Sequence, residues 1–268
     1  MTEPIINIHV VVDPALPQTW TRLNSGSEDR IRVLDSIHSK VRDVVPLIEV
    51  YKQQLEDKAK HLKDILEETY KTYLIESFYS QWDTLDVVVY QAASNNVSAI
   101  EVGGVGGDYG NGDDISSRQV FGPYARLYIL PGFEDRMEAT VLHEFGHFLR
   151  YRATSDTSFP YFNHAIFEEG LSESLVKAIL GEEHVYHKQQ ITYVELLKLK
   201  SFIEESLSDE TSGEAQRTIT KFGYRLGYRL VQHLISNGQD LKDLFKLSRR
   251  ESSQEVFKYC QQLLIEVN

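Results

Sequence analysis

The residues of this chain best suited to chemistry are two histidines that flank a glutamate, in the segment His143-Glu144-Phe145-Gly146-His147. On a helix, side chains four residues apart lie on one face, with their Cβ atoms about 5–6 Å apart. Both imidazoles can then reach one metal ion at about 2.0–2.1 Å, while Glu144 projects to one side. The spacing predicts a site in which a metal ion activates water, so hydrolysis leads the expected functions.

The sequence around this motif has the pattern of a helix over residues 134–151. Acidic residues gather at its start and basic residues at its end, which complements the helix dipole. Val141, Phe145 and Phe148 recur at helical spacing and predict an apolar face that is buried. We therefore expect the two histidines to share another face of the same helix.

A third metal ligand is needed, because a catalytic zinc usually takes three protein ligands and leaves one position for water. A second helical pattern begins at Phe167, and Glu169 lies far enough beyond the histidines for a loop and a returning helix. Glu169 is the leading candidate. His164, Asp156 and Glu168 remain alternatives, although Glu168 would point about 100° away from Glu169 on a helix and is expected in solvent.

Glu173 lies one helical turn beyond Glu169 and on the same face of the predicted helix. A carboxylate in this position can accept the second ring N–H of a ligating histidine, which fixes the tautomer and strengthens the ligand. We therefore expect Glu173 to support the metal site without binding the metal.

These motifs resemble those of the gluzincin metallopeptidases, the group that contains thermolysin and the zinc aminopeptidases. The histidine motif is followed here by Glu169-Gly170-Leu171-Ser172-Glu173, and later by Tyr224-Arg225-Leu226-Gly227-Tyr228. The second and third motifs are most similar to the YjaZ-type family of zinc-dependent proteases. The resemblance covers roughly the C-terminal half, and Gly146 departs from it, since the YjaZ type has a bulkier residue or a histidine there.

The resemblance implies a zinc metallopeptidase, a hydrolase in which His143, His147 and Glu169 bind Zn²⁺. It also implies that Glu144 acts as general base toward water and then as general acid toward the leaving amine. Glu173 falls where the thermolysin type places a supporting aspartate. The metzincin class is excluded, because it requires glycine and histidine at positions 150 and 153, where this chain has arginine and alanine.

The tyrosine motif suggests a donor for the oxyanion that develops in peptide hydrolysis, where zinc peptidases place a Tyr, His or Arg. Tyr224 and Tyr228 lie one turn apart on a helix predicted over residues 215–235, and the resemblance favours Tyr228 for this role. The alternative is that both tyrosines pack at the edge of the core, because Leu226 and Leu230 already make the helix amphipathic.

The glycine-rich segment 103–112 does not match a phosphate loop, a dinucleotide fingerprint or a calcium loop. It is predicted to be a loop or hairpin among strands at 85–91, 99–102 and 125–130. In gluzincins the sheet edge before the histidine helix can pair with an extended peptide. The segment is thus either a mobile rim over the site or a plain hairpin.

We expect an α+β, zincin-like fold with a small mixed or antiparallel sheet beside the active-site helix and a mainly helical C-terminal part. Residues 1–132 would hold the N-terminal strands, beginning at 5–12, a charged helical pair broken at Pro46, and the glycine-rich hairpin. Residues 133–268 would hold the helical metal-site part, and both would pack as one unit.

Composition narrows the function further. The chain has 268 residues, 41% hydrophobic and 25% charged, which is typical of a soluble globular protein. Its net charge of −12 disfavours nucleic-acid binding, and no apolar stretch is long enough to span a membrane. Cys260 is the only cysteine, so no internal disulfide can form. Without a recognisable secretion signal, a cytoplasmic location is the default expectation.

The leading hypothesis is a zinc-dependent peptidase that hydrolyses a peptide or protein substrate. The alternative is a metal-binding or peptide-recognition regulatory module without catalytic activity. Manganese, cobalt or nickel could occupy the same ligand set. The sequence does not distinguish an endopeptidase from an aminopeptidase, and it does not indicate an oligomeric state.

Overall fold

The computed structural model describes residues 5–11, 21–22, 45–73, 84–94, 105–110, 113–114, 119–120, 124–154, 162–205 and 222–266. They form an α+β fold, as predicted. The chain divides into two compact units, Met1–Phe148 and Leu149–Asn268, with the boundary inside one helix. The predicted division after residue 132 stays a prediction.

A mixed five-stranded sheet, with strand order β2-β1-β3-β7-β4, forms the framework of the first unit. Its strands β1, β3 and β7 are parallel, while β2 and β4 run antiparallel to their neighbours. The strands are β1 (Ile5–Val10), β2 (Thr21–Arg22), β3 (Thr84–Gln91), β4 (Val105–Gly110) and β7 (Tyr124–Ile129). A separate two-stranded ladder joins β5 (Asp113–Asp114) and β6 (Gln119–Val120).

Three predicted strands are confirmed, with ends shifted by at most two residues: β1, β3 and β7. The strand predicted at 99–102 lies outside the described residues. Of the expected loop or hairpin, residues 105–110 form the regular strand β4, which pairs antiparallel with β7 as an arm of a hairpin does. Glycine weakens a strand locally, but the ladder of backbone hydrogen bonds to β7 holds this segment extended.

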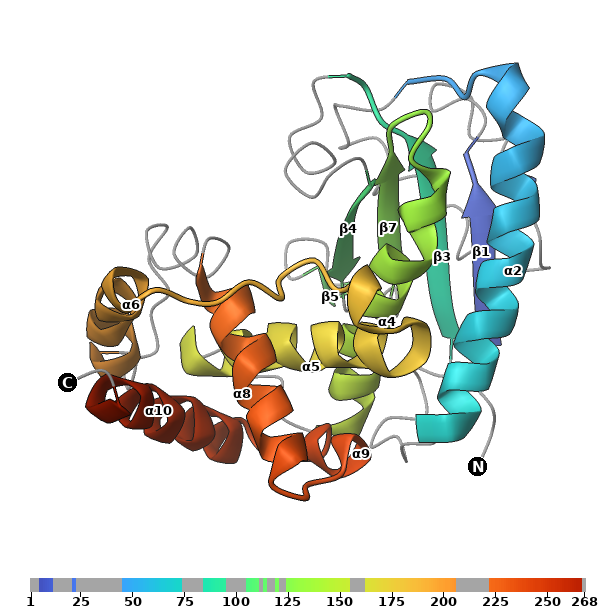
Figure 1. The fold of residues 1–268 in the computed structure, drawn as a ribbon. Coiled ribbons are helices and arrows are strands. Elements are labelled where there is room, and N and C mark those ends of the chain that lie inside the picture. Colours follow the sequence, from blue (N-terminus) through green and yellow to red (C-terminus); the bar gives the residue numbers. More distant parts are fainter. Residues whose placement is uncertain are drawn as a thin grey trace. The chain divides into compact units, whose positions relative to one another are not determined.

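Helix α2 (Glu49–Tyr73) lies over β1, as Figure 1 shows. It begins three residues after Pro46, and the first helix of the predicted pair lies outside the described residues. Its apolar stripe is fully buried, at Leu55, Ala59, Leu62 and Leu66. This burial, and not helix propensity alone, stabilises a helix of such high charge.

The short 3₁₀ helix η3 (Glu134–Arg136) leads into α4 (Met137–Ala153), which carries the histidine motif. Lys58 of α2 pairs with Asp135 at 2.5 Å, and His61 lies 3.7 Å from Glu138. Exposed ion pairs of this kind contribute little stability, but they show that α2 lies near η3 and the start of α4. The helix predicted over 134–151 is thus confirmed.

The sheet also buries a polar cluster between β1 and β3. Asn7 Nδ2 donates to Asp86 Oδ1 at 3.0 Å, and His9 Nε2 lies 3.1 Å from the same oxygen. All three side chains are at most 2% exposed. Their mutual hydrogen bonds offset part of the cost of removing polar groups from water.

The described part of the second unit is helical, as predicted for the C-terminal part. It contains α5 (Phe162–Leu180), η4 (Glu182–His184), α6 (Tyr193–Glu205), α8 (Tyr224–Ser236), α9 (Leu241–Leu244) and α10 (Arg249–Glu266). Helix α5 begins five residues before the predicted Phe167, and the predicted start of α8 at residue 215 lies outside the described residues. None of the helices in the described ranges is long and apolar enough to cross a membrane.

Helices α5 and α8 cross in direct backbone contact (Figure 1). A Cβ atom on Gly170 of α5 would overlap the backbone of Gly227 of α8. A Cβ atom on Gly227 would in turn overlap the carbonyl oxygen of Ile166. Because no side chain larger than hydrogen fits, this crossing accounts for the glycine in each of the two later motifs. Gly170 directly follows Glu169, so the crossing lies beside the candidate metal ligand.

We predict that Gly227→Ala destabilises the protein by about 3 kcal/mol, near the upper end of overpacking costs. In an uncrowded helix the same change would stabilise the protein by about 1 kcal/mol, so the sign of the change in unfolding free energy is informative. Urea denaturation measures the free energy of unfolding. Ser236→Ala, at the exposed end of α8, serves as the control. A Gly227→Ala protein as stable as the wild type would contradict the close crossing.

Candidate metal centre

Helix α4 presents the histidine motif in the predicted way. The rings of His143 and His147 lie edge to face, with centroids 5.2 Å apart and planes inclined by 72°. His143 and Glu144 are buried and His147 is partly buried. On the apolar side of the helix, Phe145 and Phe148 are at most 1% exposed. Their packing fixes the rotation of α4 about its axis, and hence the direction in which the histidines point.

Glu169 of α5 completes a group of three possible metal ligands. One ligand atom each from His143, His147 and Glu169 lies within 4.8 Å of the other two. Two imidazole nitrogens and one carboxylate oxygen are a donor set that catalytic zinc sites use, with a further position left for water. The residues therefore fit a zinc ion. Within the described parts of the chain, these are the residues found to converge in this way.

Two of the alternative ligands, His164 and Glu168, are engaged elsewhere in the second unit. His164 is fully buried, with Nδ1 2.9 Å from Ser252 Oγ and Nε2 2.9 Å from Glu168 Oε1. Asp156 lies outside the described residues. Glu168 was expected in solvent but is only partly exposed, because its side chain turns back along α5 to the buried imidazole.

Arg150 adds a buried positive charge beside the pair of His164 and Glu168. Its Nη1 donates to the carbonyl oxygen of Phe245 at 2.6 Å, and its Nε lies 3.9 Å from Glu168 Oε1. Burial lowers the pKa of Arg150 to about 10, an effect that the nearby Glu168 carboxylate partly opposes. The guanidinium remains charged at neutral pH and needs its partners. The residue preceding Glu169 is thereby tied to a buried charge network, which limits how α5 can move.

Glu173 is buried, and its Oε2 accepts the backbone N–H of Tyr186 at 3.1 Å. Tyr186 belongs to a segment of residues 185–192, hereafter the strap, that follows η4. The strap therefore meets α5 on the face that Glu169 and Glu173 share. A hydrogen bond between Glu173 and a ligating histidine stays a prediction.

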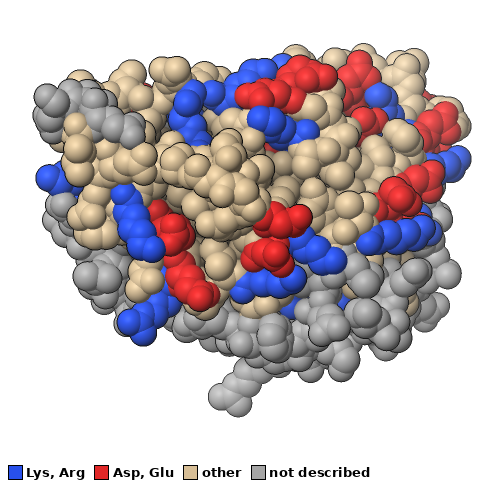
Figure 2. Space-filling model, turned by 60° about the horizontal axis from the view of Figure 1, so that its bottom comes forward, with Lys and Arg blue, Asp and Glu red and all other residues tan. Residues whose placement is uncertain are grey.

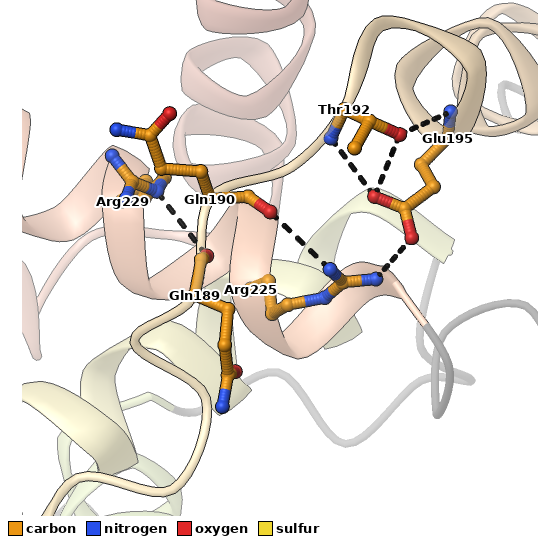
Figure 3. A network of polar contacts seen from close by, with 6 residues as sticks. All are labelled: Gln189, Gln190, Thr192, Glu195, Arg225 and Arg229. Carbon is orange, nitrogen blue, oxygen red and sulfur yellow. Dashed lines mark hydrogen bonds and ion pairs between the residues drawn. The ribbon is translucent and has the colours of Figure 1, made fainter.

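Two arginines of α8 hold the far end of the strap, as Figure 3 shows. Arg229 Nε donates to the carbonyl oxygen of Gln189 at 3.4 Å. Arg225 Nη1 donates to that of Gln190 at 3.3 Å. Backbone carbonyls that would otherwise face water thus gain charged donors, and the strap is fastened to α8.

Glu195, in the first turn of α6, binds Arg225. Arg225 Nη2 donates to Glu195 Oε1 at 2.7 Å, while the N–H and hydroxyl of Thr192 donate to Oε2 at 2.8 and 2.9 Å (Figure 3). These contacts, with that from Arg225 the largest, lower the pKa of Glu195 to about 2. Both oxygens of the carboxylate are used, so the end of the strap has a defined geometry.

The two candidate tyrosines have different surroundings. Tyr228 is buried, its ring lies 6.0 Å from Lys177 Nζ, and burial and the adjacent Glu182 carboxylate raise the pKa of its hydroxyl. Tyr224 is only partly buried, and its ring lies against that of His187 in the strap, with centroids 4.6 Å apart and planes inclined by 48°. The sequence interpretation missed His187, since no motif marks it and only the path of the strap brings it to Tyr224.

Comparison with known families agrees with this geometry. The family model described as "predicted Zn-dependent protease (DUF2268)" matches residues 62–252. The chain belongs to this family. The matched range contains the histidine motif, the Glu-Gly-Leu-Ser-Glu motif and the tyrosine motif. No curated protein and no solved structure matches the chain.

For this member of the DUF2268 family we predict about one zinc ion per chain, lost in Glu169→Ala because two imidazoles alone bind zinc weakly. Glu173→Ala should weaken binding only about 10- to 100-fold, as expected for a group that supports a ligand. Mass spectrometry of zinc-loaded protein measures the metal content. The control is Glu168→Gln, which keeps a hydrogen-bonding group beside His164 and should retain zinc. Equal loss of zinc from the Glu168 and Glu169 variants would rule out the specific ligand role.

Proposed function

We propose that this protein is a gluzincin-type zinc peptidase that hydrolyses peptide bonds, with His143, His147 and Glu169 as metal ligands. The observation that carries the proposal is the convergence of these three side chains, drawn from two helices, within 4.8 Å. The family description supports zinc-dependent proteolysis in general. The gluzincin assignment rests on the ligand set, since a glutamate on a second helix supplies the third donor.

Glu144 is the general base of the proposed reaction. A bound zinc ion would supply Lewis acidity toward water and the scissile carbonyl. The Glu144 carboxylate, on the residue next to the ligand His143 and almost excluded from solvent, accepts a proton from the attacking water and returns it to the leaving amine.

Strand β4 offers a binding edge for the substrate. It is last in the strand order, and among the described strands it pairs only with β7. An extended peptide can add to such an edge through backbone hydrogen bonds, which would select for chain conformation more than for side chains. We propose a peptide or unfolded protein segment as the substrate class.

Charge and location complete the proposal. On the face that Figure 2 presents, basic side chains stand beside acidic ones and do not gather into a basic patch. Together with the net charge of −12, this arrangement supports a function without nucleic acid. Action on soluble peptides in the cytoplasm remains part of the proposal.

The decisive variant is Glu144→Gln, which keeps the size of the side chain and removes the base. We predict unchanged zinc content and a loss of kcat of about 10²–10⁴-fold on a peptide library, the usual contribution of a general base. His143→Ala should lose both zinc and activity. A fully active Glu144→Gln protein would refute the mechanism. Zinc binding without hydrolysis in the wild type would favour the regulatory module.

For the oxyanion donor the surroundings favour Tyr224 over Tyr228, because the Tyr228 hydroxyl is buried beside Glu182. We predict that Tyr224→Phe lowers kcat by about 10²-fold, the usual effect of removing one such donor. Tyr228→Phe, the matched change one turn away, should leave kcat nearly unchanged. Steady-state kinetics of both variants on one peptide substrate distinguish the two tyrosines. A loss confined to the Tyr228 variant would return the role to that residue.

A further inference from the structure

The glycine-rich strand β4 passes directly behind the carboxylate of Glu144. A Cβ atom built on Gly107 would lie 2.5 Å from Glu144 Oε1 and 2.9 Å from the Cγ2 atom of Thr140. Both distances are shorter than real Cβ contacts allow. The backbone of β4 at Gly107 therefore forms one wall of the space that holds the Glu144 carboxylate.

The register of β4 explains why this wall is at residue 107. Gly107 pairs with Leu127 of β7, and side chains on a strand alternate between the two faces of the sheet. The Thr140 hydroxyl lies 3.4 Å from the carbonyl oxygen of Val105 and 3.2 Å from that of Arg136, which places α4 against the same stretch of strand. The Cβ position of Gly107 thus faces α4, one turn beyond Thr140, where Glu144 projects.

An added group on residue 107 would force the Glu144 carboxylate to move. Glu144 is only 6% exposed, and its helix is held by the buried aromatic side chains of the opposite face. The end of a glutamate side chain can rotate, so a methyl group on residue 107 would displace the carboxylate more readily than it would unfold the strand. Such a displacement matters, because a misplacement of about 1 Å in a reacting group can cost about 10²-fold in rate.

We propose that Gly107 is a positioning residue for the general base: the absence of a side chain there defines where the Glu144 carboxylate rests. This inference rests on the proposed peptidase function, which it deepens. It gives the glycine-rich segment a role beyond that of a rim or hairpin. Glycine in a strand interior is otherwise unfavourable, and its presence here is explained by the group that approaches it.

Gly107→Ala tests the proposal by kinetics. We expect zinc content and KM to stay near the wild-type values while kcat falls about 10- to 100-fold. Gly106→Ala places the same methyl group on the opposite face of β4, away from Glu144, so its loss of kcat should be smaller. In the Glu144→Asp background, Gly107→Ala should have little further effect, since the shorter side chain has already left the position. Equal losses in both glycine variants, or fully multiplicative losses with Glu144→Asp, would overturn the role.

A second readout does not require activity. We expect the lowering of Tm by Gly107→Ala to be smaller in a Glu144→Ala background than in the wild type, because the crowded oxygen is gone. An equal shift of Tm in both backgrounds would overturn the contact. If the wild type hydrolyses no peptide, the proposed function fails. This double-mutant cycle of Tm values still decides whether Gly107 and Glu144 are in contact.

Discussion

The contact between Gly170 and Gly227 is the constraint on which the second unit depends. Two helix backbones approach until neither glycine can carry a Cβ atom. Such a crossing leaves almost no freedom in the separation of α5 and α8, because interiors pack at the density of crystals. Since Gly170 follows Glu169 directly, this packing fixes the backbone from which the Glu169 carboxylate extends.

Near this crossing, three carboxylates of α5 take different roles because each contacts a different partner. Glu168 lies against the buried His164 and near Arg150, Glu169 joins the two histidines of α4, and Glu173 receives the N–H of Tyr186. Desolvated acids are costly unless each has a partner. In these contacts one helix supplies an anchoring charge, a candidate metal ligand and a contact for the strap within two turns.

The strap shows how a segment without regular structure can still be well defined. Its carbonyl oxygens accept from Arg225 and Arg229, and Glu195 uses both of its oxygens to hold Arg225 and Thr192. Within the strap, the ring of His187 contacts that of Tyr224. In the first unit, Gly107 positions Glu144, and it does so because it has no side chain.

The sequence by itself determined the local features of this protein. Spacing in the histidine motif predicted a helix with both imidazoles on one face, and alternating or continuous apolar runs predicted β1, β3 and β7. It also predicted an α+β fold with a helical C-terminal part. These features follow from hydrophobic periodicities of 3.6 and 2 residues, which can be read from a short stretch of sequence.

Only the tertiary structure decided which groups meet over long distances in the chain. The glycine-rich segment 105–110 became a strand because β7 supplied its hydrogen bonds, which no local pattern reveals. Glu168 is only partly exposed because it pairs with His164, which is itself buried against Ser252 of α10. Each outcome depends on a partner tens of residues away, and the energy that selects it is that of packing and desolvation, which local sequence does not encode.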